Sequence, residues 1–180
     1  IQIAQSLAAD APPEERAYVA AMAVRYSANA KSDRAKLARA YAAAMRDLSR
    51  RYPDDLDAAT LYAESLMNLN PWKLWTLDGK PAPGTEEIVR VLEAVLRRDP
   101  EHLGANHYYI HSVEASRNPE RALPSAARLA SAAPAAGHLV HMPAHIYARI
   151  GDHAAAAHAN EAGAAADRAY LATAPPDGFY

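Results

Sequence analysis

Three segments of the chain end in the same way, and this repetition constrains the fold more than any other feature. Each carries small and aliphatic residues at helical spacing and stops at a proline, namely Pro53, Pro100 and Pro134. After each proline, two or three residues lead into a further segment with helical spacing. Pro100 and Pro134 are 34 residues apart, whereas Pro53 and Pro100 are 47 apart, which is the same period plus 13 residues. Such a period predicts helical hairpins that bury their apolar faces by stacking on one another.

The composition favours helices throughout these repeats. Hydrophobic residues, many of them Ala, make up 51% of the 180 residues, and aromatic residues only 7%. A chain of this length can bury one core, so we expect a single all-α domain over residues 1–180. The 13 extra residues fall within residues 70–84, where Pro and Gly interrupt any helix. Because Trp72 and Trp75 need a surface to cover, we expect this insertion loop to fold over one end of a groove.

Charge and hydropathy exclude several classes of function. The formal charge is -2, and Lys and Arg are scattered singly, so no basic stripe predicts nucleic acid as a partner. No apolar run reaches the roughly 18 residues of a membrane span. The absence of Cys excludes disulfides and thiolate ligands, but it is compatible with both cytoplasm and periplasm. Because the sequence opens on Ile1 without a signal-peptide pattern, we expect its start to be processed or trimmed.

Two levels of resemblance can be recognised. The segments "YPDDLDAATLYAESLM", "RRDPEHLGANHYYIHSVEAS" and "YARIGDHAAAAHANEA" resemble tetratricopeptide repeats, and this resemblance covers residues 13–170. Over residues 105–170, "HYYIHSVEAS" followed by "AGHLVHMPAHIYARIGDH" resembles a bacterial family of His-rich tetratricopeptide proteins. The resemblance implies a superhelix of antiparallel helical hairpins. Members of that family continue past the point that matches Gly178-Phe179-Tyr180 into further helices with more His, so we expect the chain to be a fragment whose site lacks further ligands.

The histidines follow the repeat. All eight lie within residues 102–158, and two pairs have the same internal spacing of four residues: His107 with His111, and His141 with His145. Each member of the second pair is 34 residues beyond its counterpart in the first. Residues four apart share a helix face, and neighbouring helix axes lie 8–10 Å apart, a gap that two facing imidazoles can span. Four imidazole nitrogens can therefore converge on one point.

The resemblance also implies which surface these side chains occupy. In tetratricopeptide proteins, positions 2, 5, 9 and 12 of the first helix of each hairpin line the concave groove that binds ligands. The two His pairs take positions 5 and 9, His138 takes position 2, Glu114 position 12, and Glu64 position 9 of the preceding repeat. The predicted metal site therefore comprises His107, His111, His138, His141, His145, Glu64 and Glu114. Each glutamate is predicted to be a ligand, a proton acceptor or a hydrogen-bond acceptor for an imidazole N–H.

Two classes of function remain open at this point. Imidazole ligands without thiolate suit copper and zinc best, with nickel and iron as alternatives, and the protein would then be a metal-dependent enzyme or a metal carrier. Three protein ligands with an open position would favour catalysis or binding of a small molecule, whereas four would make the site structural. The alternative is a scaffold that binds a peptide in the same groove, with the histidines as ordinary polar contacts.

The remaining features receive structural interpretations. His102, in an interhelix turn, and His153 and His158, in an Ala-rich segment, are predicted to be structural or surface residues. Pro143 has two alternative roles. It either kinks a helix that runs through residues 138–150 or occupies the first turn of a new helix, where its missing N–H costs nothing.

Overall fold

The computed structural model describes residues 1–173, and all regular structure in that range is helical, which confirms the all-α prediction. The expected continuation at Gly178-Phe179-Tyr180 lies outside the described residues. The α-helices are α1 (Gln2–Leu7), α2 (Pro13–Ala23), α3 (Arg34–Arg51), α4 (Leu56–Met67), α5 (Thr85–Arg98), α6 (Leu103–Val113), α7 (Leu123–Ala132), α8 (Gly137–His141), α9 (Pro143–Ile150) and α10 (His153–Thr173). Short 3-10 turns occupy Ala8–Asp10 and Pro119–Ala122. None of these helices is long and apolar enough to cross a membrane.

Side-chain acceptors set where several helices begin. Asp33 accepts a hydrogen bond from the backbone N–H of Lys36 at the start of α3, and Asp55 accepts one from Ala58 at the start of α4. The Nδ1 atom of His102 accepts from Ala105 at 3.2 Å and begins α6 in the same way. These bonds satisfy backbone donors that have no partner within the helix. His102 is thus a structural residue, as the sequence predicted.

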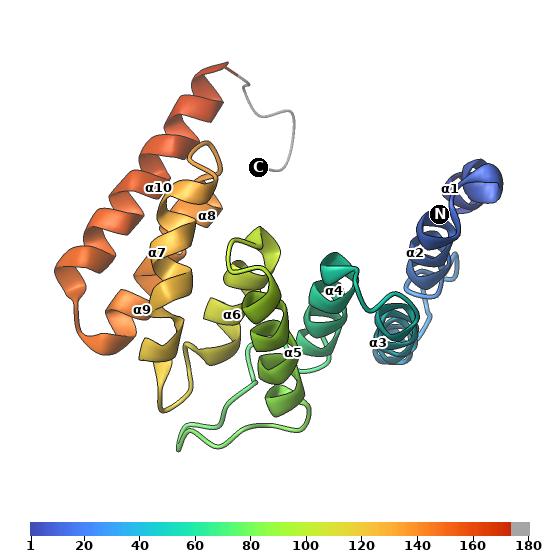
Figure 1. The fold of residues 1–180 in the computed structure, drawn as a ribbon, viewed down its shortest axis with the longest axis horizontal. Coiled ribbons are helices and arrows are strands. Elements are labelled where there is room, and N and C mark those ends of the chain that lie inside the picture. Colours follow the sequence, from blue (N-terminus) through green and yellow to red (C-terminus); the bar gives the residue numbers. More distant parts are fainter. Residues whose placement is uncertain (174–180) are drawn as a thin grey trace.

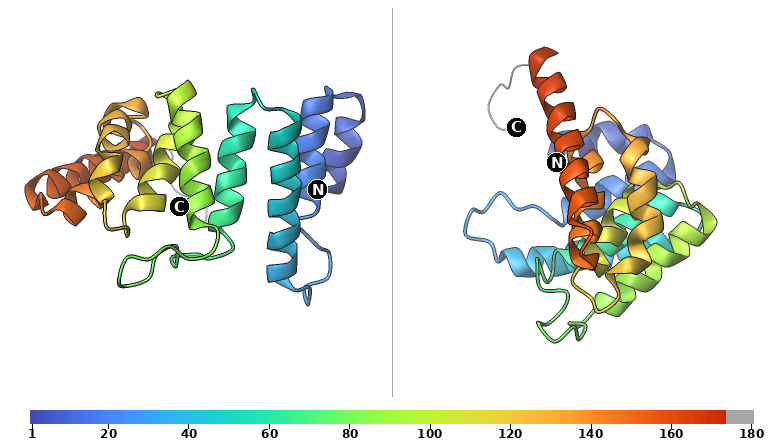
Figure 2. Two further views of the ribbon diagram at one scale, coloured as in Figure 1. Left: turned by 60° about the horizontal axis from the view of Figure 1, so that its bottom comes forward. Right: turned by 90° about the vertical axis from the view of Figure 1, so that its left-hand side faces the viewer.

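The helices form a single row in which each packs mainly on its neighbours along the chain (Figure 1). The second view shows the same order from α1 at one end to α10 at the other (Figure 2). In addition, α4 packs on α6 and α6 on α9, so the first helices of successive hairpins stack on one another. The largest core lies between α4, α5, α6, α7 and α9, and a separate apolar cluster joins α2, α3 and α4.

The third predicted first helix is divided in two. The segment 138–150 forms α8 and α9, with Pro143 at the first position of α9. Met142 between them keeps right-handed helical angles, so the chain continues in helical sense while the ladder of hydrogen bonds is interrupted. Both predicted roles of Pro143 are therefore present, because the proline starts one helix by ending another.

The insertion loop at residues 70–84 is tied to the core. Leu74 is only 8% exposed and belongs to the largest core cluster, and the Thr85 hydroxyl donates to its carbonyl oxygen. The indole Nε1–H of Trp75 donates to the Ser112 carbonyl oxygen of α6 at 2.7 Å. Trp72 differs, since its side chain is 91% exposed and its φ is 61°. The loop is therefore anchored at Leu74 and Trp75, and the expectation that both tryptophans would be covered is wrong for Trp72.

Asp55 provides a test of how α2 and α4 are joined, because it caps α4 and also accepts a hydrogen bond of 2.7 Å from the Tyr18 hydroxyl of α2. Asp55→Ala should lower the free energy of unfolding by about 2 kcal/mol, the sum of a lost cap and a lost side-chain bond. Asp54→Ala, at an exposed neighbouring carboxylate, should change it by less than about 0.5 kcal/mol. Urea denaturation measures both values, and equal effects would contradict the assignment.

Candidate metal centre

The site begins with one face of α6. His107, His111 and Glu114 follow one another at spacings of four and three residues, which places their side chains on the same side of the helix. The other side of α6 carries its buried residues, among them Tyr109, Ile110 and Val113, and is held in the core. The polar stripe therefore faces away from the core, towards α8 and α9.

The opposite wall of the site comes from α8 and α9. His138 on α8 lies with its Nε2 atom 3.0 Å from the Nε2 atom of His107. This distance requires one ring to donate an N–H and the other to accept. His145 on α9 lies with its ring centre 5.0 Å from that of His111. The imidazoles of two successive repeats thus meet across the interface, as the 34-residue spacing predicted.

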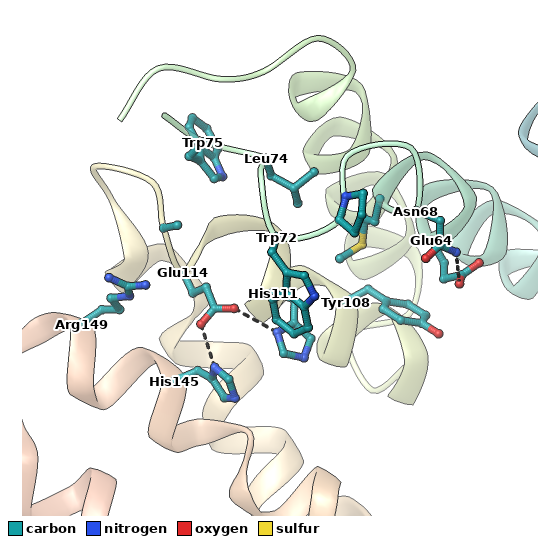
Figure 3. A pocket seen from close by; sticks show the side chains of 13 residues that line it. Glu64, Asn68, Trp72, Leu74, Trp75, Tyr108, His111, Glu114, His145 and Arg149 are labelled. Carbon is teal, nitrogen blue, oxygen red and sulfur yellow. Dashed lines mark hydrogen bonds and ion pairs between the residues drawn. The ribbon is translucent and has the colours of Figure 1, made fainter. Parts of the chain in front are cut away.

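Glu114 joins the two walls. Its Oε1 atom lies 3.0 Å from Nδ1 of His111, and its Oε2 atom lies 2.7 Å from Nδ1 of His145 (Figure 3). An ionised carboxylate only accepts, so both imidazoles donate Nδ1–H to it. In the neutral form of each ring, the lone pair is then on Nε2, which is the atom left free for an ion. A carboxylate that orients metal-binding imidazoles in this way is a recurrent feature of metal sites.

Burial and mutual proximity shift the pKa values of these groups. Burial acts to raise the pKa of Glu114, but the hydrogen bonds from His111 and His145 outweigh it and lower the pKa from 4.5 to about 2. Burial and the neighbouring imidazoles together lower the pKa of His107 from 6.5 to about 4. The pKa of His138 is lowered for the same reasons. His107 therefore remains a neutral potential ligand well below neutral pH.

Two overlapping sets of side chains have ligand atoms within 4.8 Å of one another. One is His107, His111 and His138, and the other is His111, Glu114 and His145. Tetrahedral coordination with bonds of 2.0–2.1 Å separates ligand nitrogens by about 3.3 Å, close to the 3.0 Å between His107 and His138. The first set therefore needs only small side-chain shifts to surround an ion. In the second set, the Glu114 oxygens already face the two Nδ1–H groups.

His141 and Glu64 lie outside both sets. A Cβ atom at Gly163 of α10 would come within 2.8 Å of the Cβ atom of His141, so the backbone of α8 is pressed against α10 at that point. His141 is accordingly near Asn160 of α10, although its ring centre remains 5.0 Å from that of His145. Glu64 on α4 accepts a hydrogen bond from Asn68 instead of facing an imidazole. His153 and His158 are exposed on α10, as expected of surface residues.

A cavity of about 420 Å³ adjoins the site, and the sequence did not predict its composition. His111, Glu114 and His145 form one side of it, and the insertion loop contributes Trp72, Leu74 and Trp75 (Figure 3). Arg149 also lines it, a residue that was not among the predicted site residues. Its position four residues after His145, on the same face of α9, was the available signal.

No protein-family model matches the chain, and no match was found among curated proteins or solved structures. The assignment of the site therefore depends on its own geometry.

The metal-free protein should lose stability as the pH falls from about 6.5 towards 4. In this interval the unfolded chain takes up a proton at residue 107, whereas the folded state keeps His107 neutral, so acid favours unfolding. The loss due to this group should be about 2 kcal/mol, after allowance for the partial exposure of the ring. Denaturation of chelator-treated protein across this range measures it. His107→Gln should flatten the dependence and His153→Gln should not, and parallel curves for all three proteins would contradict the assignment.

Proposed function

We propose that the protein binds a transition metal ion, copper or zinc, through the imidazoles of His107, His111 and His138. One observation carries this proposal: Glu114 accepts Nδ1–H from both His111 and His145 and leaves their Nε2 atoms available beside two further imidazoles. A structural histidine needs one satisfied nitrogen, and a cluster of this kind has several unsatisfied ones. Ligands of this type suit zinc and copper.

Glu114 and His145 have supporting roles in this proposal. Glu114 holds the His111 ring and raises its basicity, as carboxylates behind metal-bound imidazoles do. His145, held by the same carboxylate, presents its Nε2 atom next to the three ligands. It is a fourth ligand in a metal carrier or a proton donor and acceptor beside an open coordination position in an enzyme. The open arrangement is favoured because the cavity reaches His111 and His145.

The proposal includes the architecture that presents the site. The stacking of α4 on α6 and of α6 on α9 supports a tetratricopeptide-type superhelix, with the metal on the surface lined by the first helices. The period of 34 residues and the matched positions of the histidines support the same assignment.

Metal titration of single-site variants tests the ligand set. A metal that binds only the folded state stabilises it by about 2.7 kcal/mol at one hundred times Kd, so the parent should melt at higher temperature with added zinc or copper. His111→Ala should abolish this rise, and elemental analysis should show no retained metal. His141→Ala should keep most of the rise, because that side chain lies outside both ligand sets. His153→Ala, at an exposed position, is the control.

The opposite pattern would contradict the assignment. If His141→Ala loses the metal and His138→Ala keeps it, the ligands follow the repeat spacing instead of the geometry described above. If the parent neither retains nor responds to any of copper, zinc, nickel and iron, the metal proposal fails. The surface would then be assigned to peptide binding.

Glu114 has a separate signature. Glu114→Gln preserves the shape of the side chain but removes the charge and one of the two acceptor atoms. We expect metal affinity to fall about 10-fold to 100-fold, as for other residues that orient ligands, without loss of the fold. Competition with a chelator of known affinity measures the change. An affinity equal to that of the parent would show that Glu114 does not orient the ligands.

A further inference from the structure

The cavity beside the proposed ion has the dimensions of a small-molecule site. Its volume of about 420 Å³ falls in the range of roughly 300–1,000 Å³ that is usual for such sites. It lies between α4, α6, α9 and the insertion loop, and most of its lining is apolar or aromatic. A mainly apolar cavity with a few polar groups at defined places selects a ligand by the position of those groups.

Trp72 forms an exposed apolar surface in this cavity. Its side chain is 91% exposed, although a tryptophan in water forfeits more burial energy than any other residue. Its φ of 61° is uncommon for a bulky residue, and the indole stands edge-on to the His111 ring with centres 6.4 Å apart. Trp75 and Tyr108 continue the same wall. The geometry thus holds an indole in water, next to the metal centre, with a face open to a planar or branched apolar group.

Arg149 supplies a positive charge at one side of the cavity. The described residues offer it no ion pair and no hydrogen bond, whereas several other arginines of the chain are paired, for example Arg98 with Asp54 and Arg128 with Glu101. Glu114, which lies near it in Figure 3, already accepts bonds from two imidazoles. A guanidinium in this position is suited to a carboxylate, which it can bind through two parallel hydrogen bonds.

Glu64 supplies a negative charge at the other side. One of its oxygens accepts from Asn68, and the second, Oε2, is buried without a hydrogen-bond partner. Figure 3 shows Glu64 and Arg149 on opposite sides of the residues that line the cavity, with Trp72 and His111 between them. A buried acceptor without a donor is costly, so a ligand that brings a hydroxyl or ammonium group to it would be favoured.

We infer that this cavity binds a small organic carboxylate with an aromatic body and a hydrogen-bond donor at its far end. The carboxylate pairs with Arg149, the ring lies on Trp72, and the donor reaches Glu64. This inference deepens the proposed function, and it rests on that function for one point only, namely that the bound molecule lies beside an ion held at His111. Recognition by Arg149 and Glu64 does not require the ion.

The two tryptophans of the chain both line this cavity, so their indole N–H signals in ¹H–¹⁵N NMR spectra report its occupancy directly. The probes are 3-(4-hydroxyphenyl)propionate and the corresponding amide, titrated into zinc-treated and chelator-treated protein. The acid should shift both indole signals and bind about tenfold more tightly than the amide, because only the acid carries the charge that Arg149 recognises.

Two variants assign the polar ends. Arg149→Gln should weaken the acid about tenfold and leave the amide unchanged, with Arg97→Gln, at an exposed arginine on α5, as the matched control. Glu64→Gln should weaken the hydroxylated acid but not 3-phenylpropionate, which has no donor at that end. Neither variant should alter zinc uptake, because neither residue belongs to the ligand sets.

The outcomes separate the two proposals. Zinc uptake without any shift of the indole signals, or equal affinity of parent and Arg149→Gln protein for the acid, overturns the carboxylate site and leaves the metal proposal standing. Discrimination between acid and amide in a protein that takes up no metal overturns the metal proposal and supports the carboxylate site alone. Zinc uptake together with the expected discrimination supports both.

Discussion

The two hydrogen bonds of Glu114 are the interaction on which the rest of the site depends. They join the last turn of α6 to α9, so a single carboxylate fixes the orientation of imidazoles from two successive repeats. Each bond also determines which nitrogen of its ring carries the proton, and it is the tautomer that exposes Nε2. Without this carboxylate, His111 and His145 would be free to rotate about χ2. Their spacing in the sequence would then place them near each other without aiming them at a common point.

Much of the fold could be predicted from the sequence because its information is local and periodic. The prolines at 53, 100 and 134 each follow the end of a second helix, at α3, α5 and α7. Stacking of identical units then places position 107 near the repeat that begins after Pro134, whatever the details of the loops. The insertion loop was recognisable from its Pro and Gly, but its attachment through Leu74 and Trp75 depends on contacts with α6 that no local pattern specifies.

The candidate site was predictable to the extent that the repeat is regular. His107, His111, His145 and Glu114 lie where the period places them, but His138 faces His107 and His141 is turned towards α10. Pro143 interrupts the hydrogen bonds of the helix, and Gly163 lets α10 approach the backbone of α8, so the face of α8 is set by packing instead of by spacing. Glu64 shows the same limit, because its partner is Asn68, one turn away on its own chain segment. Arg149 was missed because a single arginine after a histidine pair carries no periodic signal.

The protonation pattern of the metal-free site also bears on how an ion would enter it. Glu114 keeps its charge because its pKa is about 2, and the two Nδ1–H groups that it accepts need not leave. His107 is neutral because its pKa is about 4, so no imidazolium has to be discharged there at neutral pH. The obstacle is the pair of Nε2 atoms of His107 and His138, 3.0 Å apart, of which one carries a proton. Transfer of that proton to the Nδ1 atom of the same ring exposes both lone pairs without changing the charge of the site. Entry of an ion therefore requires one change of tautomer and little movement of the helices, since the remaining imidazoles are already oriented by the carboxylate that joins α6 to α9.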